Sequence, residues 1–150
     1  GIAELATQGF VSNRGRTQMA VEYWHNQGDL QPWENLTDFY TVDPAHYGQV
    51  YVQGRHMVSY INENFGEEPR IKWIESMMEG ASLEEATESA LGQAWTEIDS
   101  QWRAEVAHAA AERIRKREEA AKKAEQEAEQ EAEREGDPKT KPTPKPDKGG

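Results

Sequence analysis

The aromatic residues of this chain are confined to its front part, and this distribution limits where a packed core can form. All five Trp, all five Tyr and all three Phe lie before residue 103 of the 150-residue chain. Because large apolar side chains supply most of the driving force for folding, we expect one small domain over residues 1–106. Residues 107–135 should form a charged helix rich in Ala, Glu and Lys, and residues 136–150 a disordered Pro/Lys/Gly tail.

The apolar residues of the front part recur at helical spacing. In the central stretch 50–66 they fall three and four positions apart, as one face of a helix requires: Met57, Val58, Tyr60, Ile61 and Phe65. Gly66 follows the last of them, where glycine ends a helix most easily. No pair of segments has the alternating pattern of paired strands. The sequence therefore predicts an all-α fold of about five short packed helices, followed by a long charged helix and a disordered tail.

Residues that cap helix ends predict where several helices begin. Asp43 before Pro44 resembles an N-cap followed by proline in the first turn. The central helix should therefore begin near Pro44, or form two pieces that break near Gly54. Ser82 and Glu85 have the spacing of a capping box, in which each side chain bonds the backbone N–H of the other residue.

Other helix limits follow from similar patterns. The segment 96–99 repeats the spacing of the capping box, with Thr first and Asp last, and should begin the final helix. A helix is predicted over 17–27, with the Ser12-Asn13 pair before it acting as a breaker. Residues 70–79 carry apolar side chains at helical spacing and should form another amphipathic helix.

Composition excludes several classes of function. The formal net charge is -11, whereas binding to nucleic acid needs clustered Lys and Arg, so no nucleic-acid partner is expected. The chain has no Cys, which removes disulfides and thiol catalysis. No apolar run approaches the roughly 18 residues of a membrane-spanning helix, so no membrane span is expected.

Side chains with catalytic chemistry are sparse. The four histidines are His25, His46, His56 and His108, and no pair has the His-Glu-x-x-His spacing that places two imidazoles around zinc. We therefore expect no metal site held by this chain alone. Tyr51 has two interpretations: an aromatic ring that packs at a helix start, or a phenol that donates a hydrogen bond to an oxyanion. Spacing alone favours the packing interpretation.

The stretch 50–66 resembles a segment of the gluzincin zinc metallopeptidases, the peptidase MA-like group that includes the aminopeptidase-N-related enzymes. That family has Tyr-x-x-Gly, then a second Tyr nine residues after the first, then a closing Gly. The matching positions here are Tyr51, Gly54, Tyr60 and Gly66. The resemblance implies that Tyr51 stabilises the tetrahedral intermediate of peptide hydrolysis, with Tyr47, one turn earlier, as the competitor for that role.

The start of the chain is similar to the same family. Its members carry a helix that has roughly the pattern Trp-x-x-Glu-Gly-Leu-Ala-Glu, whose first Glu is the third zinc ligand. Gly1-Ile2-Ala3-Glu4 matches the second half of this pattern. The resemblance places the ligand immediately before Gly1 and makes Glu4 the acid that orients a zinc-bound His from the second shell of the site. Later segments look like the usual ending of such domains: 80–86, 90–92 and 99–103.

The resemblance implies a function for an intact parent protein. Residues 1–106 would be the C-terminal helical half of a zinc peptidase domain, cut through a structural element. Zinc, the His-Glu-x-x-His segment and the peptide or protein substrate would belong to the parent, and this chain alone would be inactive. The family suggests export to the periplasm or secretion.

An alternative from a different class is a noncatalytic helical interaction or scaffold module with a charged spacer. Within residues 109–135, oppositely charged residues lie four apart, as in the pair Glu118–Lys122. Ala121, Ala124, Ala128 and Ala132 form only a thin stripe. This pattern favours a solvated single helix, and self-association through the helix is the other possibility.

Overall fold

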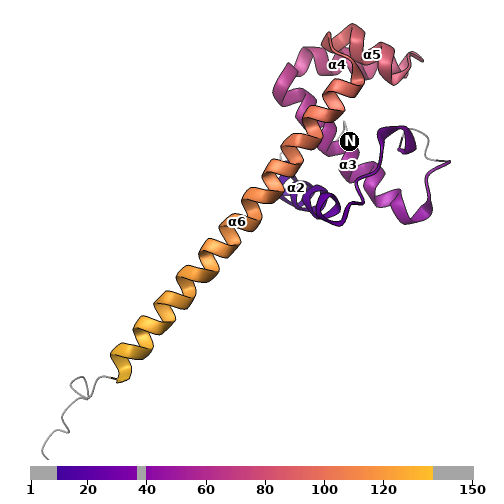
Figure 1. The fold of residues 1–150 in the computed structure, drawn as a ribbon. Coiled ribbons are helices and arrows are strands. Elements are labelled where there is room, and N and C mark those ends of the chain that lie inside the picture. Colours follow the sequence, from indigo (N-terminus) through magenta and orange to yellow (C-terminus); the bar gives the residue numbers. More distant parts are fainter. Residues whose placement is uncertain (1–9, 37–39, 137–150) are drawn as a thin grey trace, which may run out of the picture. The chain divides into compact units, whose positions relative to one another are not determined.

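In the computed structural model, residues 10–36 and 40–136 are described, and they are helical with no strand. The prediction of an all-α fold is confirmed for these residues (Figure 1). The elements, in chain order, are α2 (Phe10–Gln27), η1 (Trp33–Asn35), η2 (Pro44–His46), α3 (Tyr47–Phe65), α4 (Glu67–Met78), α5 (Leu83–Leu91) and α6 (Trp95–Gly136), where η marks a 3-10 helix.

The chain divides into two compact units, Gly1–Ala111 and Glu112–Gly150. The division therefore falls inside α6, a few residues after the predicted domain end at residue 106. Burial explains the difference, because Ala110 is only 2% exposed, one helical turn beyond the buried Val106.

The central helix begins as its capping residues predict. A side-chain oxygen of Asp43 accepts a hydrogen bond from the backbone N–H of Ala45 at 2.9 Å, and Pro44 opens the short η2 turn. The chain continues directly into α3, which runs unbroken through Gly54, so the alternative of two pieces is wrong. Gly66 has a φ of 95° and ends the helix, a conformation that glycine adopts without strain.

The capping box at the start of α5 is confirmed. The hydroxyl of Ser82 accepts from the backbone N–H of Glu85 at 3.2 Å, and the carboxylate of Glu85 accepts from the backbone N–H of Ser82 at 2.9 Å. The hydrogen bond from the backbone N–H of Ser82 lowers the pKa of the Glu85 carboxyl below its usual value, and the hydrogen bond from the Ser82 hydroxyl lowers it further. Gly92 ends α5 in the left-handed conformation, with a φ of 69°.

Two predicted helix limits are wrong. The last helix begins at Trp95 and not with a cap from Thr96, because the backbone carbonyl of Ala94 accepts its first hydrogen bonds. Asp99 instead pairs with Arg103 on the next turn, at 2.9 Å. The Ser12-Asn13 pair does not break α2, which already begins at Phe10. Polar residues of this kind are tolerated in the first turn of a helix, where backbone N–H groups lack partners within the helix.

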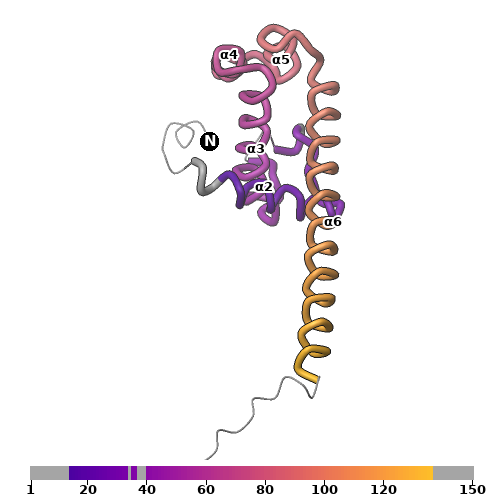
Figure 2. The backbone as a smooth tube through the Cα atoms, turned by 90° about the vertical axis from the view of Figure 1, so that its left-hand side faces the viewer, coloured from indigo at the N-terminus to yellow at the C-terminus, as the bar shows by residue number. Residues whose placement is uncertain are grey.

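Buried side chains of α3 and of the first part of α6 make up most of the core of the first unit, and the two helices cross one another (Figure 1 and, turned by 90°, Figure 2). α4 and α5 pack together at one end of α3. Indole rings link these parts: Trp33 of η1 lies edge-on to Trp95 and Trp102, with centroids 5.7 and 5.5 Å away. Trp73 of α4 stacks on Trp95 at 6.4 Å. One aromatic cluster therefore joins the loop after α2 to α4 and α6.

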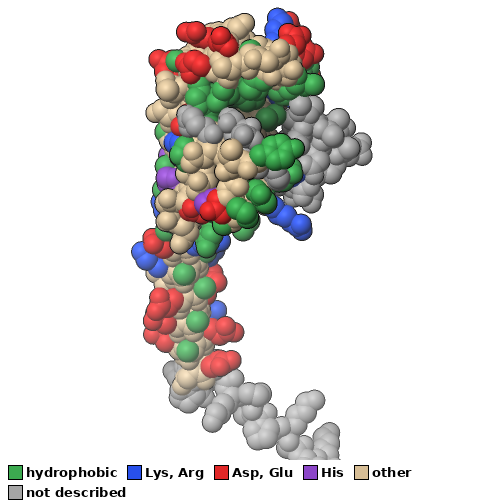
Figure 3. All heavy atoms as spheres, turned by 90° about the vertical axis from the view of Figure 1, so that its right-hand side faces the viewer, with side chains coloured by type: hydrophobic (Ala, Val, Ile, Leu, Met, Phe, Trp, Pro, Cys, Tyr) green, Lys and Arg blue, Asp and Glu red, His purple; other side chains and the backbone are tan. Residues whose placement is uncertain are grey.

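In the second unit, the described residues 112–136 are all helical and nearly all exposed. Acidic side chains line this part of α6, with small hydrophobic side chains between them (Figure 3). Arg115 pairs with Glu112 at 2.9 Å and with Glu119 at 2.6 Å, and Lys123 approaches Glu127 at 3.8 Å. None of the helices in the described ranges combines the length and apolar composition needed to cross a membrane.

Candidate functional site

Tyr51 and Tyr47 lie one turn apart in the first two turns of α3, so their side chains share one face of that helix. Tyr51 is 60% exposed and Tyr47 is 38% exposed, whereas Tyr60 is 7% exposed and belongs to the core. Nine positions correspond to about two and a half helical turns, which puts Tyr51 and Tyr60 on opposite faces. Tyr51 is therefore not a core aromatic. Glu4, the other predicted site residue, lies outside the described residues.

A zinc site needs three or four His, Cys, Asp or Glu side chains that converge on one point. Between residues 10 and 136, leaving aside 37–39, no three His, Asp or Glu side chains come together closely enough to hold a metal ion. These residues do not fit zinc, and no chemical step through zinc follows from their geometry.

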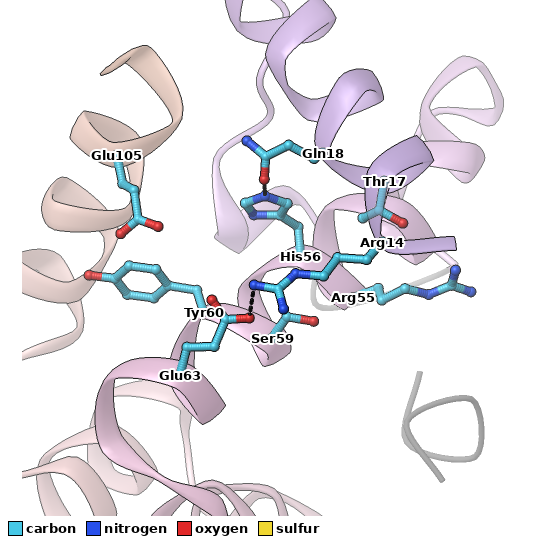
Figure 4. A pocket seen from close by; sticks show the side chains of 9 residues that line it. All are labelled: Arg14, Thr17, Gln18, Arg55, His56, Ser59, Tyr60, Glu63 and Glu105. Atoms are coloured by element: carbon cyan, nitrogen blue, oxygen red, sulfur yellow. Dashed lines mark hydrogen bonds and ion pairs between the residues drawn. The ribbon is translucent and has the colours of Figure 1, made fainter. Parts of the chain in front are cut away.

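Polar side chains converge on a small cavity between α2, α3 and α6 (Figure 4). Its volume is about 80 Å³, which is room for a few water molecules. α2 contributes Arg14 and Gln18, α3 contributes His56 and Tyr60, and α6 contributes Glu105. The cavity thus lies where three helices of the first unit meet.

Four side chains form a hydrogen-bonded network beside this cavity, here called the His56 network. The indole N–H of Trp102 donates to Nδ1 of His56 at 2.8 Å. Nε2 of His56 lies 2.6 Å from Oε1 of Gln18, and Nε2 of Gln18 donates to the carboxylate of Glu22 at 2.8 Å. The network connects α6 to α3 and α3 to α2.

The tautomer of His56 follows from its partners. An indole N–H can only donate, so Nδ1 must carry a lone pair and the ring proton must lie on Nε2. Nε2 then donates to Oε1 of Gln18, and this leaves the Gln18 amide group free to donate to Glu22. Every donor in the network meets an acceptor only while the imidazole is neutral.

Electrostatics favour the same protonation state. Burial lowers the pKa of His56 from 6.5 to about 4, the nearby Glu22 carboxylate opposes this shift, and Arg14 adds to it. His56 is therefore neutral at pH 7. The carboxylate of Glu105 also lies near Tyr60, whose pKa is raised mainly by burial and further by that charge.

The charges around the cavity balance. Arg14 of α2 forms an ion pair with Glu63 of α3, and Arg55 and Glu105 also line the cavity. Two cations and two carboxylates give no net preference for an anionic or a cationic ligand. The arrangement therefore favours a packing contact between helices over a binding site for a charged molecule.

A second polar cluster holds the loop after α2. The amide groups of Gln49 and Gln53, one turn apart on α3, donate to the backbone carbonyls of Asp29 and Gln31, both at 2.8 Å. Arg103 of α6 donates to the same Gln31 carbonyl at 3.1 Å. The loop is therefore fixed through its backbone.

The His56 network leaves no recognisable pattern in the sequence. Gln18 and Trp102 lie 38 and 46 residues from His56 along the chain, so no local spacing links them. The buried amides Gln49 and Gln53 were detectable in principle, because two glutamines one turn apart on the core side of a helix need backbone partners.

The comparisons with known proteins found no family model, no curated protein and no solved structure that matches this chain. The gluzincin resemblance therefore rests on the residue patterns alone. It stays a prediction, and so does the role that it implies for Tyr51.

Proposed function

We propose that this chain contributes the C-terminal helical part of a gluzincin-type zinc peptidase, in which Tyr51 hydrogen-bonds the oxyanion formed during peptide hydrolysis. The position of Tyr51 carries the proposal. Its ring is exposed at the start of α3, while the opposite face of the helix is held in the core through Tyr60 and Ile61. A phenol on a rigid helix, pointing away from the core, suits a group that must meet a substrate.

The chemical contribution of this chain is a hydrogen bond that strengthens during the reaction. As water attacks a peptide carbonyl, negative charge develops on the carbonyl oxygen, and a phenol O–H directed at that position stabilises the charge. Such a donor lowers the barrier only if it binds the transition state more strongly than the substrate. In this proposal, the zinc ligands required for the attack lie in polypeptide before Gly1.

The direct test uses this chain together with any polypeptide that the gene encodes before Gly1. Tyr51→Phe removes only the hydroxyl, and the expected loss of the peptide hydrolysis rate is on the order of 10²–10³, with zinc content unchanged. Tyr47→Phe is the matched control, because it removes a phenol one turn away on the same face, and its rate should stay near wild type.

The two variants separate the possible results. A large loss for Tyr47→Phe alone would transfer the role to Tyr47. Wild-type rates for both variants, with zinc bound, would remove the tyrosines from the mechanism. A His-Glu-x-x-His motif encoded upstream of a Glu that adjoins Gly1 is the simplest independent support, and its absence would favour the second candidate below.

The second candidate is a noncatalytic helical module that uses α6 as a spacer or docking arm. It is favoured by the exposed charged stretch 112–136, in which Arg115 pairs with two glutamates of its own helix. Charges satisfied within one helix do not need a partner chain. Sedimentation of a peptide covering residues 104–135 separates a monomeric spacer from a self-associating helix.

A further inference from the structure

We propose that His56 makes the packing of α2 against α3 and α6 sensitive to acid, because protonation of its imidazole disrupts the network that joins these helices. This inference does not depend on the proposed peptidase function. It concerns Trp102, His56 and Gln18, which belong to three different helices of the first unit.

Protonation of His56 would place two hydrogen-bond donors opposite one another. A protonated imidazole carries hydrogen on both ring nitrogens, and the Trp102 indole has no acceptor to offer. Two N–H groups would then face each other at the 2.8 Å that separates Trp102 Nε1 from His56 Nδ1. Trp102 is fully buried, so its N–H group cannot turn to water instead. Protonation therefore leaves a buried donor without a partner, which is costly.

A proton from solvent can reach the His56 imidazole in the folded chain. His56 lines the 80 Å³ cavity, so water can reach the imidazole without prior unfolding of the unit. An imidazolium that left its place beside Trp102 would find carboxylates in the same cavity, on Glu63 of α3 and Glu105 of α6. Glu63 is already paired with Arg14, so the cavity offers the charged ring little compensation for the lost contact with Trp102.

The charged groups around His56 come from all three helices. α2 presents Arg14 and Glu22, α3 presents Arg55 and Glu63, and α6 presents Glu105.

Burial outweighs these charges and lowers the pKa of folded His56 to about 4, against 6.5 ordinarily. Between these two values the opened form binds a proton that the closed form does not. The closed packing of α2 is therefore fully favoured above about pH 6.5 and weakens as pH falls toward about 4.

Hydrogen exchange of the full chain tests this directly. Amide exchange in α2 is measured at pH 7 and pH 5 and corrected for the intrinsic pH dependence of exchange. With pKa values of 6.5 opened and about 4 closed, the opening constant should rise about 20-fold between these conditions. Amides of α5, which contributes no residue to the network, provide an internal reference.

A pair of variants isolates the imidazole. In His56→Gln, the amide oxygen can accept from Trp102 and the amide nitrogen can donate to Gln18, but the side chain does not titrate. The pH-dependent rise in α2 exchange should therefore disappear. His108→Gln makes the same substitution at an exposed position of α6 and should respond to pH like the wild type. An equal rise in His56→Gln, or no rise in the wild type, would overturn the proposal.

A spectroscopic titration of the wild-type chain keeps the test independent of the folding of His56→Gln. ¹⁵N chemical shifts of the His56 ring report its tautomer and its pKa, and the Trp102 indole N–H resonance should shift with the same midpoint. We expect hydrogen on Nε2 and a midpoint well below 6.5. A midpoint near 6.5, or hydrogen on Nδ1 at pH 7, would contradict the donor conflict.

Discussion

At the scale of single residues, side chains of the same type differ in burial and in hydrogen-bond partners according to where they lie in the fold. Tyr51 and Tyr60 occur on one helix, yet one is mostly exposed and the other lies in the core. Trp102 and Trp73 are both buried, and each indole N–H has a specific acceptor: His56 for Trp102 and Thr87 for Trp73. Buried indole N–H groups usually find such partners, and these two hydrogen bonds help to orient the rings of Trp73 and Trp102.

The contact between Trp73 and Thr87 gives a prediction at this scale. Thr87→Val keeps the shape of the side chain but removes the hydroxyl that accepts from the Trp73 indole at 3.0 Å. The N–H group would stay buried without an acceptor, so the free energy of unfolding should fall by about 1–3 kcal/mol. Urea unfolding measures the change.

Thr96→Val, at an exposed position of α6, is the control and should change the free energy of unfolding by less than about 0.5 kcal/mol. If Thr87→Val matches this control, the hydrogen bond contributes nothing measurable.

At the scale of elements, short-range contacts determine most helix ends. Asp43 and the pair Ser82–Glu85 act within four residues, and the structure shows their hydrogen bonds where the sequence predicts them. Trp95 shows the opposite case. Its ring is buried against Trp33 and Trp73, and α6 begins at this packed residue without a cap from Thr96.

The capping box predicts a measurable effect on α5. Ser82→Ala removes the hydroxyl that accepts from the Glu85 backbone N–H, and loss of such a cap costs about 1 kcal/mol of stability. Amide exchange at the start of α5 should accelerate together with this loss.

The same substitution at an exposed position inside α6, Ser100→Ala, should be neutral or slightly stabilising, since alanine is the better helix former there. Equal destabilisation by both variants would show that the cap has no special role.

At the scale of the whole molecule, the two units have different sources of stability. The first contains every aromatic residue and the whole of the buried core. The described part of the second is exposed, so propensity and charge pairs within the helix support it, at about 0.2–0.5 kcal/mol per pair. A helix supported in this way is marginal and melts with little cooperativity.

On heating, the two units should unfold in separate transitions. Far-UV circular dichroism reports helix in both, whereas tryptophan signals report only the first, because all Trp lie before residue 103. Far-UV signal should decline gradually before the tryptophan transition, and 1 M salt should enlarge this early phase by screening the exposed pairs. Deleting residues 112–150 should remove the early phase. Coincident transitions in the intact chain would contradict this view.

The all-α class, most helix ends and the charged character of the segment after residue 106 could be predicted from the sequence alone. These properties depend on spacings of a few residues, over which periodicity and capping act. Two local predictions failed. Ser12-Asn13 falls within the first turn of α2, where polar residues are tolerated, and the start of α6 depends on the packing of Trp95.

Which polar groups meet depends on how the helices pack in three dimensions. His56 acquires its neutral state from Trp102 and Gln18, which are brought to it by two other helices. The exposure of Tyr51 likewise depends on which face of α3 the core selects. Burial and long-range hydrogen bonds arise when helices pack, so the spacing of residues along one helix does not specify them.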